Sequence, residues 1–405
     1  QEKRYKSLTR HGNKHKGTKM IKLILLGLLA GAFFSSTFIL NEMMSAAGGH
    51  WFWSASLRYV FMWLIITGII LFQQGMGRLK ALTAVFCQHW VFWCLTGSIG
   101  FGLFYAGICY AADHVAGWVV AATFMFTVVT SLLVLMVFGQ RFDKKFILYA
   151  LLVFVGVVMV NVSEGLHAAA LADTDIAHAV PMAQMLLYGA LPALIAAFSY
   201  PIGNQLVWQV THNSRTPALP ADLADQSHAV SGTADTHDEP LTSEAYDLPP
   251  TLYDTSTTST ALNALPAAAP APSLLQTLIH RIPSIETTLL HNAFNKVWLM
   301  TVGSLPFWLL LGMIVRPELP DSTQVFNTLL VALLAGVAAT TIFLYARGQA
   351  VTSSEVAGVD ATQASEVIFA LIGGILLLGN SVPSAMGLLG IGLIIIGLIL
   401  FAKDG

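Results

Sequence analysis

The chain carries at residues 384–402 the stretch SAMGLLGIGLIIIGLILFA, in which no residue is charged. A helix needs about 20 apolar residues to cross the roughly 30 Å hydrocarbon core of a bilayer, and this stretch meets that length. An open sheet would leave backbone groups unpaired in lipid, so the spanning structure is helical. The stretch therefore predicts a transmembrane helix.

The rest of the chain repeats this signal. Of the 405 residues, 55% are hydrophobic and 10% are charged, with a mean hydropathy of +0.69, whereas soluble globular chains carry about 25% charged residues. Further apolar runs lie at 20–41, 51–72, 90–110, 115–138, 146–162, 185–208, 289–315, 325–346 and 358–379. With residues 384–402 they predict an all-α integral membrane protein with ten transmembrane helices.

The basic residues indicate how these spans are oriented. Segments on one side carry seven Lys or Arg before Met20, followed by Arg78, Lys80, Arg141, Lys144, Lys145, Arg347 and Lys403. The loops on the other side carry only Arg316. Cytoplasmic loops are enriched in Lys and Arg, so we expect a multi-pass protein of the cytoplasmic (inner) membrane with both termini in the cytoplasm. An alternative for the first span is a cleaved signal peptide, because small residues follow it at 45–47.

The apolar runs and the segments between them predict the domain organisation. Residues 211–275 hold eight acidic residues with Arg215 as the counter-charge, a composition typical of disorder. The basic tail is expected to lack structure, or else to lie on anionic lipid. The expected segments are the tail at 1–19, a first five-helix repeat at 20–162, an external loop at 163–184, a sixth span at 185–210, a disordered acidic cytoplasmic loop at 211–288 and the remaining spans at 289–405.

Short matches between the two halves predict an internal repeat. Ser36 and Asn41 in the first span match Ser199 and Asn204 in the sixth, and Val-Ala-Gly opens both the fourth span (115–117) and the ninth (356–358). Because each half has an odd number of spans, the halves would have opposite orientations in the membrane. We therefore expect two inverted five-helix repeats with a substrate site between them.

The charged residues inside the spans are the main candidates for function. They are Arg58, Lys296, Asp360 and Glu366. A charge in the bilayer is costly unless it faces a partner or water. Glu366 is expected to bind a proton or a cation, or else to pair structurally with a basic residue. Arg58 and Lys296 either contact substrate, or snorkel or pair structurally.

Polar side chains near these charges complete the candidate site. Thr362 and Gln363 share a helical face with Glu366, so we expect all three to face a cavity. Ser199 and Tyr200 lie between two prolines, which bend helices and free carbonyls. Asn41 and Asn204 are expected to cap helices or act as gates. The remaining candidates are Ser36 and Tyr105. The three cysteines and twelve histidines show neither disulfide nor metal spacing, so no metal or other cofactor is expected.

Several motifs together resemble a known family. They are Ser36–Asn41 (STFILN), Trp51–Arg58 (WFWSASLR), Gly100–Tyr105 (GFGLFY), Ala197–Asn204 (AFSYPIGN), Ser304–Trp308 (SLPFW) and Ala361–Ala370 (ATQASEVIFA). They resemble the multidrug resistance efflux branch of the drug/metabolite transporter (DMT, EamA-like) superfamily. The resemblance implies a ten-helix inverted repeat with a central cavity formed by spans one to four and six to nine. It also matches Arg58 to the family's arginine in the second span and Glu366 to its acidic residue in the ninth.

The chain departs from related proteins in two places. The acidic loop replaces a compact connection, and the first span has no carboxylate before Glu42, unlike the small four-span multidrug pumps. Their coupling mechanism therefore cannot be copied to this chain.

From these features we expect a secondary active transporter, not an enzyme. It would exchange small amphipathic or cationic compounds for protons by alternating access, as a monomer or homodimer in a lipid bilayer and without nucleic acid. The first alternative is an exporter of amino acids or related metabolites, in which Arg58 or Lys296 would bind a substrate carboxylate. An alternative of another class is a membrane-embedded lipid-modifying enzyme or a lipid scramblase.

Overall fold

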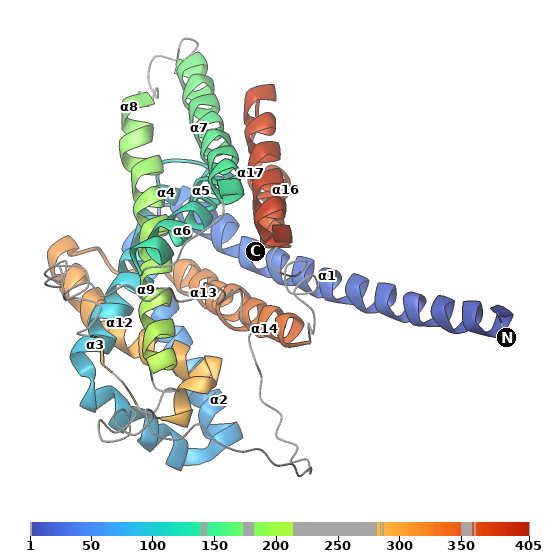
Figure 1. The fold of residues 1–405 in the computed structure, drawn as a ribbon. Coiled ribbons are helices and arrows are strands. Elements are labelled where there is room, and N and C mark those ends of the chain that lie inside the picture. The colour runs from blue at the N-terminus through green and yellow to red at the C-terminus, as the bar shows by residue number, and fades with distance from the viewer. Residues whose placement is uncertain are drawn as a thin grey trace, which may run out of the picture. The chain divides into compact units, whose positions relative to one another are not determined.

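The structure is a computed structural model of an all-helical chain (Figure 1). It describes residues 2–138, 144–172, 182–213, 287–349 and 362–404, together with the single positions 282, 283, 285 and 359. Expectations that concern Asp360, the Val-Ala-Gly motif at 356–358 and residues 214–281 of the acidic loop lie outside these residues. One compact unit comprises residues 1–209 and 288–405, and residues 210–287 form a second unit.

The described residues include nine helical segments long and apolar enough to cross a membrane and a tenth that is shorter. The first five are part of α1 (Glu2–Ala46), α2 (Trp51–Gln88), α3 with η1 and α4 (Trp90–Gly97, Ser98–Leu103, Phe104–Ala112), α5 with α6 (Gly117–Phe124, Thr127–Val137) and α7 (Lys144–Ala172). The second five are α8 with η2 and α9 (Met182–Met185, Leu186–Ala190, Leu191–Asn213), α12 (Ala293–Val315) after η3 (Thr288–His291), α13 with η4 and α14 (Ser322–Val331, Ala332–Ala339, Thr340–Gly348), η5 with α16 (Thr362–Ala364, Ser365–Leu378) and α17 (Ala385–Asp404). Each of the ten predicted apolar runs thus contains helix.

Several helices extend beyond the predicted apolar runs. Residues 2–19 continue α1 as a helix, although the sequence indicated an unstructured tail. The expected loop after residue 72 is also helical, because α2 only breaks at Gly75 (φ 77°) and then continues to Gln88. Likewise α7 extends to Ala172, into the expected external loop that begins at 163. Hydropathy locates the lipid-buried part of a helix but does not locate the end of its backbone hydrogen bonding.

Local side chains define several helix ends. Asn292 Oδ1 accepts a hydrogen bond from the Phe294 amide at 2.8 Å, and Asp321 Oδ1 accepts one from the Gln324 amide at 2.6 Å. These caps satisfy amide groups that have no partner within the helix. At the C-terminal end of α16, Gly379 adopts a left-handed conformation (φ 71°) that terminates the helix.

Four spans are not continuous α-helices. Wider π-helical turns occur in the third, sixth and eighth spans, at η1, η2 and η4. The fourth span is interrupted between α5 and α6, at Met125 and Phe126. In the sixth span the irregular turn ends just before Pro192, whereas α9 continues through Pro201. Such irregular turns often mark functional sites in helices.

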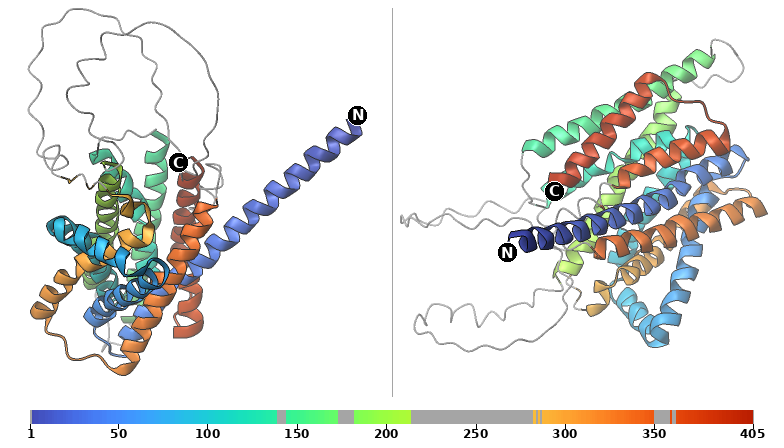
Figure 2. Two further views of the ribbon diagram at one scale, coloured as in Figure 1. Left: turned by 90° about the horizontal axis from the view of Figure 1, so that it is seen from below. Right: turned by 90° about the vertical axis from the view of Figure 1, so that its right-hand side faces the viewer.

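Close packing between the helices depends on small residues, as is usual in membranes. The pairing of α7 with α17 is visible in both figures and is the most extensive one (Figures 1 and 2). α12 crosses α3 where a side chain on Gly303 would lie 2.6 Å from the Trp93 carbonyl carbon. α1 packs against α16 and η5, and Gly27 and Gly31 face Thr362 and Ser365. The Gly-xxx-Gly pair of the first span is therefore a contact within the chain.

Candidate functional site

A buried polar cluster lies between the first, second and third spans. Asn41 and Tyr105 exchange hydrogen bonds, with 3.1 Å from Asn41 Nδ2 to Tyr105 Oη and 3.4 Å from Tyr105 Oη to Asn41 Oδ1. The Arg58 guanidinium lies 4.1 Å from the centre of the Tyr105 ring, and its Nη1 donates to Thr37 Oγ1 at 3.4 Å. The sequence predicted Asn41, Arg58 and Tyr105 as site residues, and the structure brings them together.

Arg58 is unusual because it is buried without a carboxylate. Its side chain is 9% exposed, and its Nε has no hydrogen-bond partner. Within the described residues, the guanidinium interacts with aromatic faces and hydroxyl groups and forms no ion pair. A guanidinium remains charged at any ordinary pH. This group can therefore attract an anion or a polarisable ring, but it is not neutralised in place.

An aromatic cluster that the sequence did not predict surrounds this arginine. The Tyr59 ring stacks with Phe101 at 5.2 Å and with Trp308 at 5.7 Å between centroids. Trp308 Nε1 is buried without a hydrogen-bond partner. The motifs GFGLFY and SLPFW contain two of these residues, but only the fold shows that they meet beside Arg58.

Tyr200 and Glu366 form the second part of the candidate site. The Tyr200 ring packs on Phe104 at 5.0 Å and on Phe124 at 5.8 Å, yet 37% of its surface is exposed. Electrostatic interactions connect Tyr200 with Glu366 and with Arg58, and its hydroxyl interacts with Asn204. Tyr200 therefore interacts with Arg58 and Glu366, two of the four charged residues predicted within the spans.

Glu366 lies in the first turn of α16 and is half-buried. Among the residues that the structure describes, its carboxylate has neither an ion pair nor a hydrogen bond. The expected alternative of a structural pair with Arg58 or Lys296 is therefore not what this structure contains.

The structure separates other predicted residues from this region. Thr362 is buried against Gly27 and donates to the Val359 carbonyl at 2.6 Å, whereas Gln363 is exposed. Lys296 lies in the first turn of α12, about 18 Å along the helix from Trp308. The sequence placed Lys296 deeper because it started the span at 289, but residues 288–291 form a separate 3-10 turn.

The two matched serines bond to their own helices. Ser36 donates to the Phe33 carbonyl at 2.6 Å, and Ser199 donates to the Ile195 carbonyl at 2.8 Å. These hydroxyl groups thus satisfy local carbonyls in this structure.

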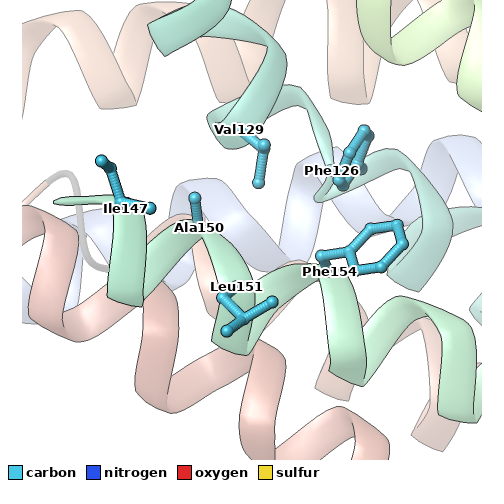
Figure 3. A pocket seen from close by; sticks show the side chains of 6 residues that line it. All are labelled: Phe126, Val129, Ile147, Ala150, Leu151 and Phe154. Carbon is cyan, nitrogen blue, oxygen red and sulfur yellow. The ribbon is translucent and has the colours of Figure 1, made fainter.

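A shallow, open pocket lies between the start of α6 and α7 (Figure 3). It has a volume of about 230 Å³, and its lining is wholly apolar. The lining residues are Phe126, Val129, Ile147, Ala150, Leu151 and Phe154. None of the predicted site residues lines this pocket, which lacks any group that would bind an ion.

These features define a multi-pass helical membrane protein in which a few polar residues meet among the spans. A family model described as "EmrE: Putative multidrug resistance efflux transporter" matches residues 21–404. The chain belongs to this family of membrane transporters, which is part of the drug/metabolite transporter superfamily, as the sequence motifs predicted.

Individual proteins are also similar to this chain. The chain is 28% identical over 396 residues to "Uncharacterized protein YjlA" of Bacillus subtilis (strain 168), with 94% of each chain covered. It is 34% identical over 202 residues to "Uncharacterized 42.1 kDa protein in intracellular alkaline protease 3'region" of Shouchella clausii. This match covers 47% of this chain and 49% of that protein. A solved structure titled "Crystal structure of protein" has a TM-score of 0.49 and 12% identity, over 95% of this chain and 98% of that one.

Proposed function

We propose that this protein is a secondary active transporter that exports small amphipathic or cationic compounds in exchange for protons. The observation that carries the proposal is the Glu366 carboxylate, which has no ion pair and no hydrogen bond among the described residues. An ionised carboxylate without a partner is costly in an apolar helix, and either a proton or a cationic substrate relieves that cost. Competition between the two for one carboxylate couples their movements.

Aromatic rings support a cationic or amphipathic substrate. Tyr200 interacts electrostatically with Glu366 and packs on Phe104 and Phe124. Ring faces attract organic cations, and their apolar surface accepts the rest of an amphipathic molecule.

The packing of the helices supports two repeats and alternating access between them. In a repeat of five spans, a contact between two spans should recur between the two spans that correspond to them in the other half. The third span packs against the seventh, and the corresponding eighth and second spans also pack against each other. The first span packs against the ninth. The corresponding sixth and fourth spans also meet, because the Thr130 hydroxyl of the fourth span donates a hydrogen bond to the Ala197 carbonyl of the sixth. An odd number of spans in each half makes these repeats inverted. We further propose that both termini are cytoplasmic and that the protein works as a monomer or homodimer in the inner membrane.

Proteoliposomes test the role of Glu366. An imposed pH gradient is expected to drive a quaternary ammonium compound across membranes that contain the wild-type protein. Glu366→Gln should abolish this movement because the amide cannot take up a proton, whereas Glu318→Gln, at an exposed carboxylate, should leave it unchanged. Full proton-driven transport by a folded Glu366→Gln variant would refute the proposal.

Arg58 favours a second candidate, an exporter of amino acids or related metabolites. Its buried guanidinium has no carboxylate partner within the described part of the chain, and a substrate carboxylate would supply one. Uptake of anionic or zwitterionic metabolites, with no movement of organic cations, would favour this candidate and should disappear in Arg58→Gln.

Lipid chemistry is the remaining alternative. The described residues contain no group of three or more His, Cys, Asp or Glu that could hold a metal ion. Movement of lipid without solute flux in the same proteoliposomes would favour a scramblase over a transporter.

A further inference from the structure

Glu42 connects three parts of the chain near the end of α1. Its Oε2 accepts a hydrogen bond from the Gly117 amide at 2.7 Å, and its Oε1 accepts one from Asn380 Nδ2 at 2.7 Å. Gly117 begins α5, and Asn380 lies in the connection between α16 and α17. The Glu42 carboxylate thus accepts one hydrogen bond from each half of the chain.

The backbone is shaped to allow this contact. A side chain on Gly117 would lie 2.6 Å from the Phe38 carbonyl oxygen and 3.0 Å from Glu42 Oε2, so only glycine lets α5 approach α1 this closely. The Gly117 amide is in the first turn of α5 and has no helical partner of its own. Hydrogen bonds from such amides to a carboxylate are short and strong because the acceptor is charged.

Other bonds close the same end between the two halves. Ser163 and Ser384 hydroxyl oxygens are 2.7 Å apart. Gln324 Nε2 donates to the His50 carbonyl at 2.8 Å and to Ser54 Oγ at 2.9 Å. Each of these contacts pairs a residue before 210 with one after 288.

The matching position in the other half carries a glutamine. Asn41 and Glu42 correspond to Asn204 and Gln205, because the sequence match Ser36–Asn41 to Ser199–Asn204 continues by one residue. Gln205 is 8% exposed, and its Nε2 has no hydrogen-bond partner among the residues that the structure describes. The two halves therefore differ at this position, with a carboxylate in one and an amide in the other.

We propose that Glu42 is a positioning residue for transport: together with Asn380 it latches the gate at this end of the helices, and the latch must open in each cycle. This inference rests on the alternating access of the proposed function but not on its substrate or on Glu366. The latch acts through hydrogen bonds between helices and does not contact the transported molecule.

Cys109 provides a native reporter for this gate. It is 2% exposed and lies on α4, one helical turn before Asp113 at the end of the third span. In a Cys87→Ser/Cys94→Ser background it is the remaining cysteine of the chain. Labelling by a membrane-impermeant methanethiosulfonate, applied in turn to each side of the membrane, then measures how often this end opens.

Two latch variants and one control test the inference. Glu42→Gln replaces one accepting oxygen with an NH2 group, so the bonds from Gly117 and Asn380 cannot both be kept, and Asn380→Ala removes one donor. Each should label Cys109 about ten-fold or more faster than the background, from the side at which Glu42 lies, as expected for loss of a hydrogen bond to a charged group. Glu318→Gln, an exposed carboxylate whose side chain is not in these contacts, should label at the background rate.

The outcomes separate this inference from the proposed function. Unchanged labelling in Asn380→Ala, with thermal unfolding like that of the background, would overturn the latch even if Glu42→Gln did not fold. Faster labelling from both sides in either variant would also overturn it, because that indicates general loosening. Since labelling needs no substrate, a latch that opens in a protein without proton-driven flux would refute the role of Glu366 and leave the latch standing.

Discussion

Replacing Gly27 with alanine tests whether Thr362 packs against the first span or lines a cavity. A methyl group on Gly27 would overlap Thr362 Oγ1 and would lie 2.9 Å from its Cγ2 and 3.0 Å from its Cβ. Contacts this short do not persist, so either α1 and η5 separate or Thr362 rotates and loses its bond to the Val359 carbonyl.

The expected loss of stability follows from two opposing effects. Overpacking a close helix contact costs about 1 to 3 kcal/mol. Alanine in a helix gains about 0.5 to 1 kcal/mol over glycine. The net loss for Gly27→Ala is therefore about 1 to 2 kcal/mol. Thr362→Ala alone should lose about 1 kcal/mol, the value of one hydrogen bond.

The double variant gives the sharper result. Removing the Thr362 hydroxyl and methyl leaves only its Cβ near the new side chain, so Gly27→Ala/Thr362→Ala should be about as stable as Thr362→Ala alone. The coupling is then about 1 to 2 kcal/mol, in the range found for residues in direct contact. Gly68→Ala is the matched control, because nothing lies within 4 Å of a side chain there.

The assay is unfolding of the purified protein in mixed micelles by sodium dodecyl sulfate, followed by tryptophan fluorescence. The free energy of unfolding should fall in Gly27→Ala and should stay level or rise in Gly68→Ala. In the double variant it should be higher than the sum of the two single losses predicts. Additive effects, or a Gly27→Ala variant as stable as Gly68→Ala, would show that these helices do not meet as described.

Three further predictions concern other contacts. Gly303→Ala should lower stability by about 1 to 3 kcal/mol in the same assay, because its new side chain would meet the Trp93 backbone, which cannot rotate away. Tyr105→Phe should lose about 1 kcal/mol through its bonds to Asn41, whereas Tyr105→Ala should lose about 3 to 5 kcal/mol with the ring; equal losses would argue against the cluster. Partial burial raises the pKa of the Asp113 carboxyl in the turn after the third span. Protonated Asp113 therefore stabilises the fold below the ordinary pKa of about 3.9, and this stabilisation is lost as pH rises through the raised pKa. Across that pH range, the thermal unfolding of Asp113→Asn should depend less on pH than that of the wild type.

The candidate site was only partly readable from the sequence. Arg58 and Glu366 stood out because charges are rare inside apolar runs, and their positions needed no knowledge of neighbours. Thr362 and Gln363 were grouped with Glu366 by helical geometry, but a 3-10 turn at 362–364 alters the spacing, and Thr362 packs against Gly27. Tyr59 gave no signal, and Trp308 appeared only as the last residue of the SLPFW motif, because aromatic residues are common throughout these spans.

Glu42 shows the limit of reading a single span. It lies near the end of the first run, where a carboxylate ordinarily indicates a helix terminus in water. Its partners Gly117 and Asn380 are 75 and 338 residues away, so no local pattern connects them. Only the packing of α5 and the α16–α17 connection against α1 assigns it a role.

The sequence by itself determined that this protein lies in a membrane and where its spans are. Transfer of about 20 apolar residues into lipid depends on the composition of each run and not on its neighbours, so hydropathy alone is sufficient. The motif pattern similarly identified the family. Tertiary structure decided which helices touch, where α2 and the fourth span break, and which polar groups meet, because these depend on van der Waals contact between small residues far apart in the chain. The surroundings of Arg58 and the bonds of Glu42 belong to this second class.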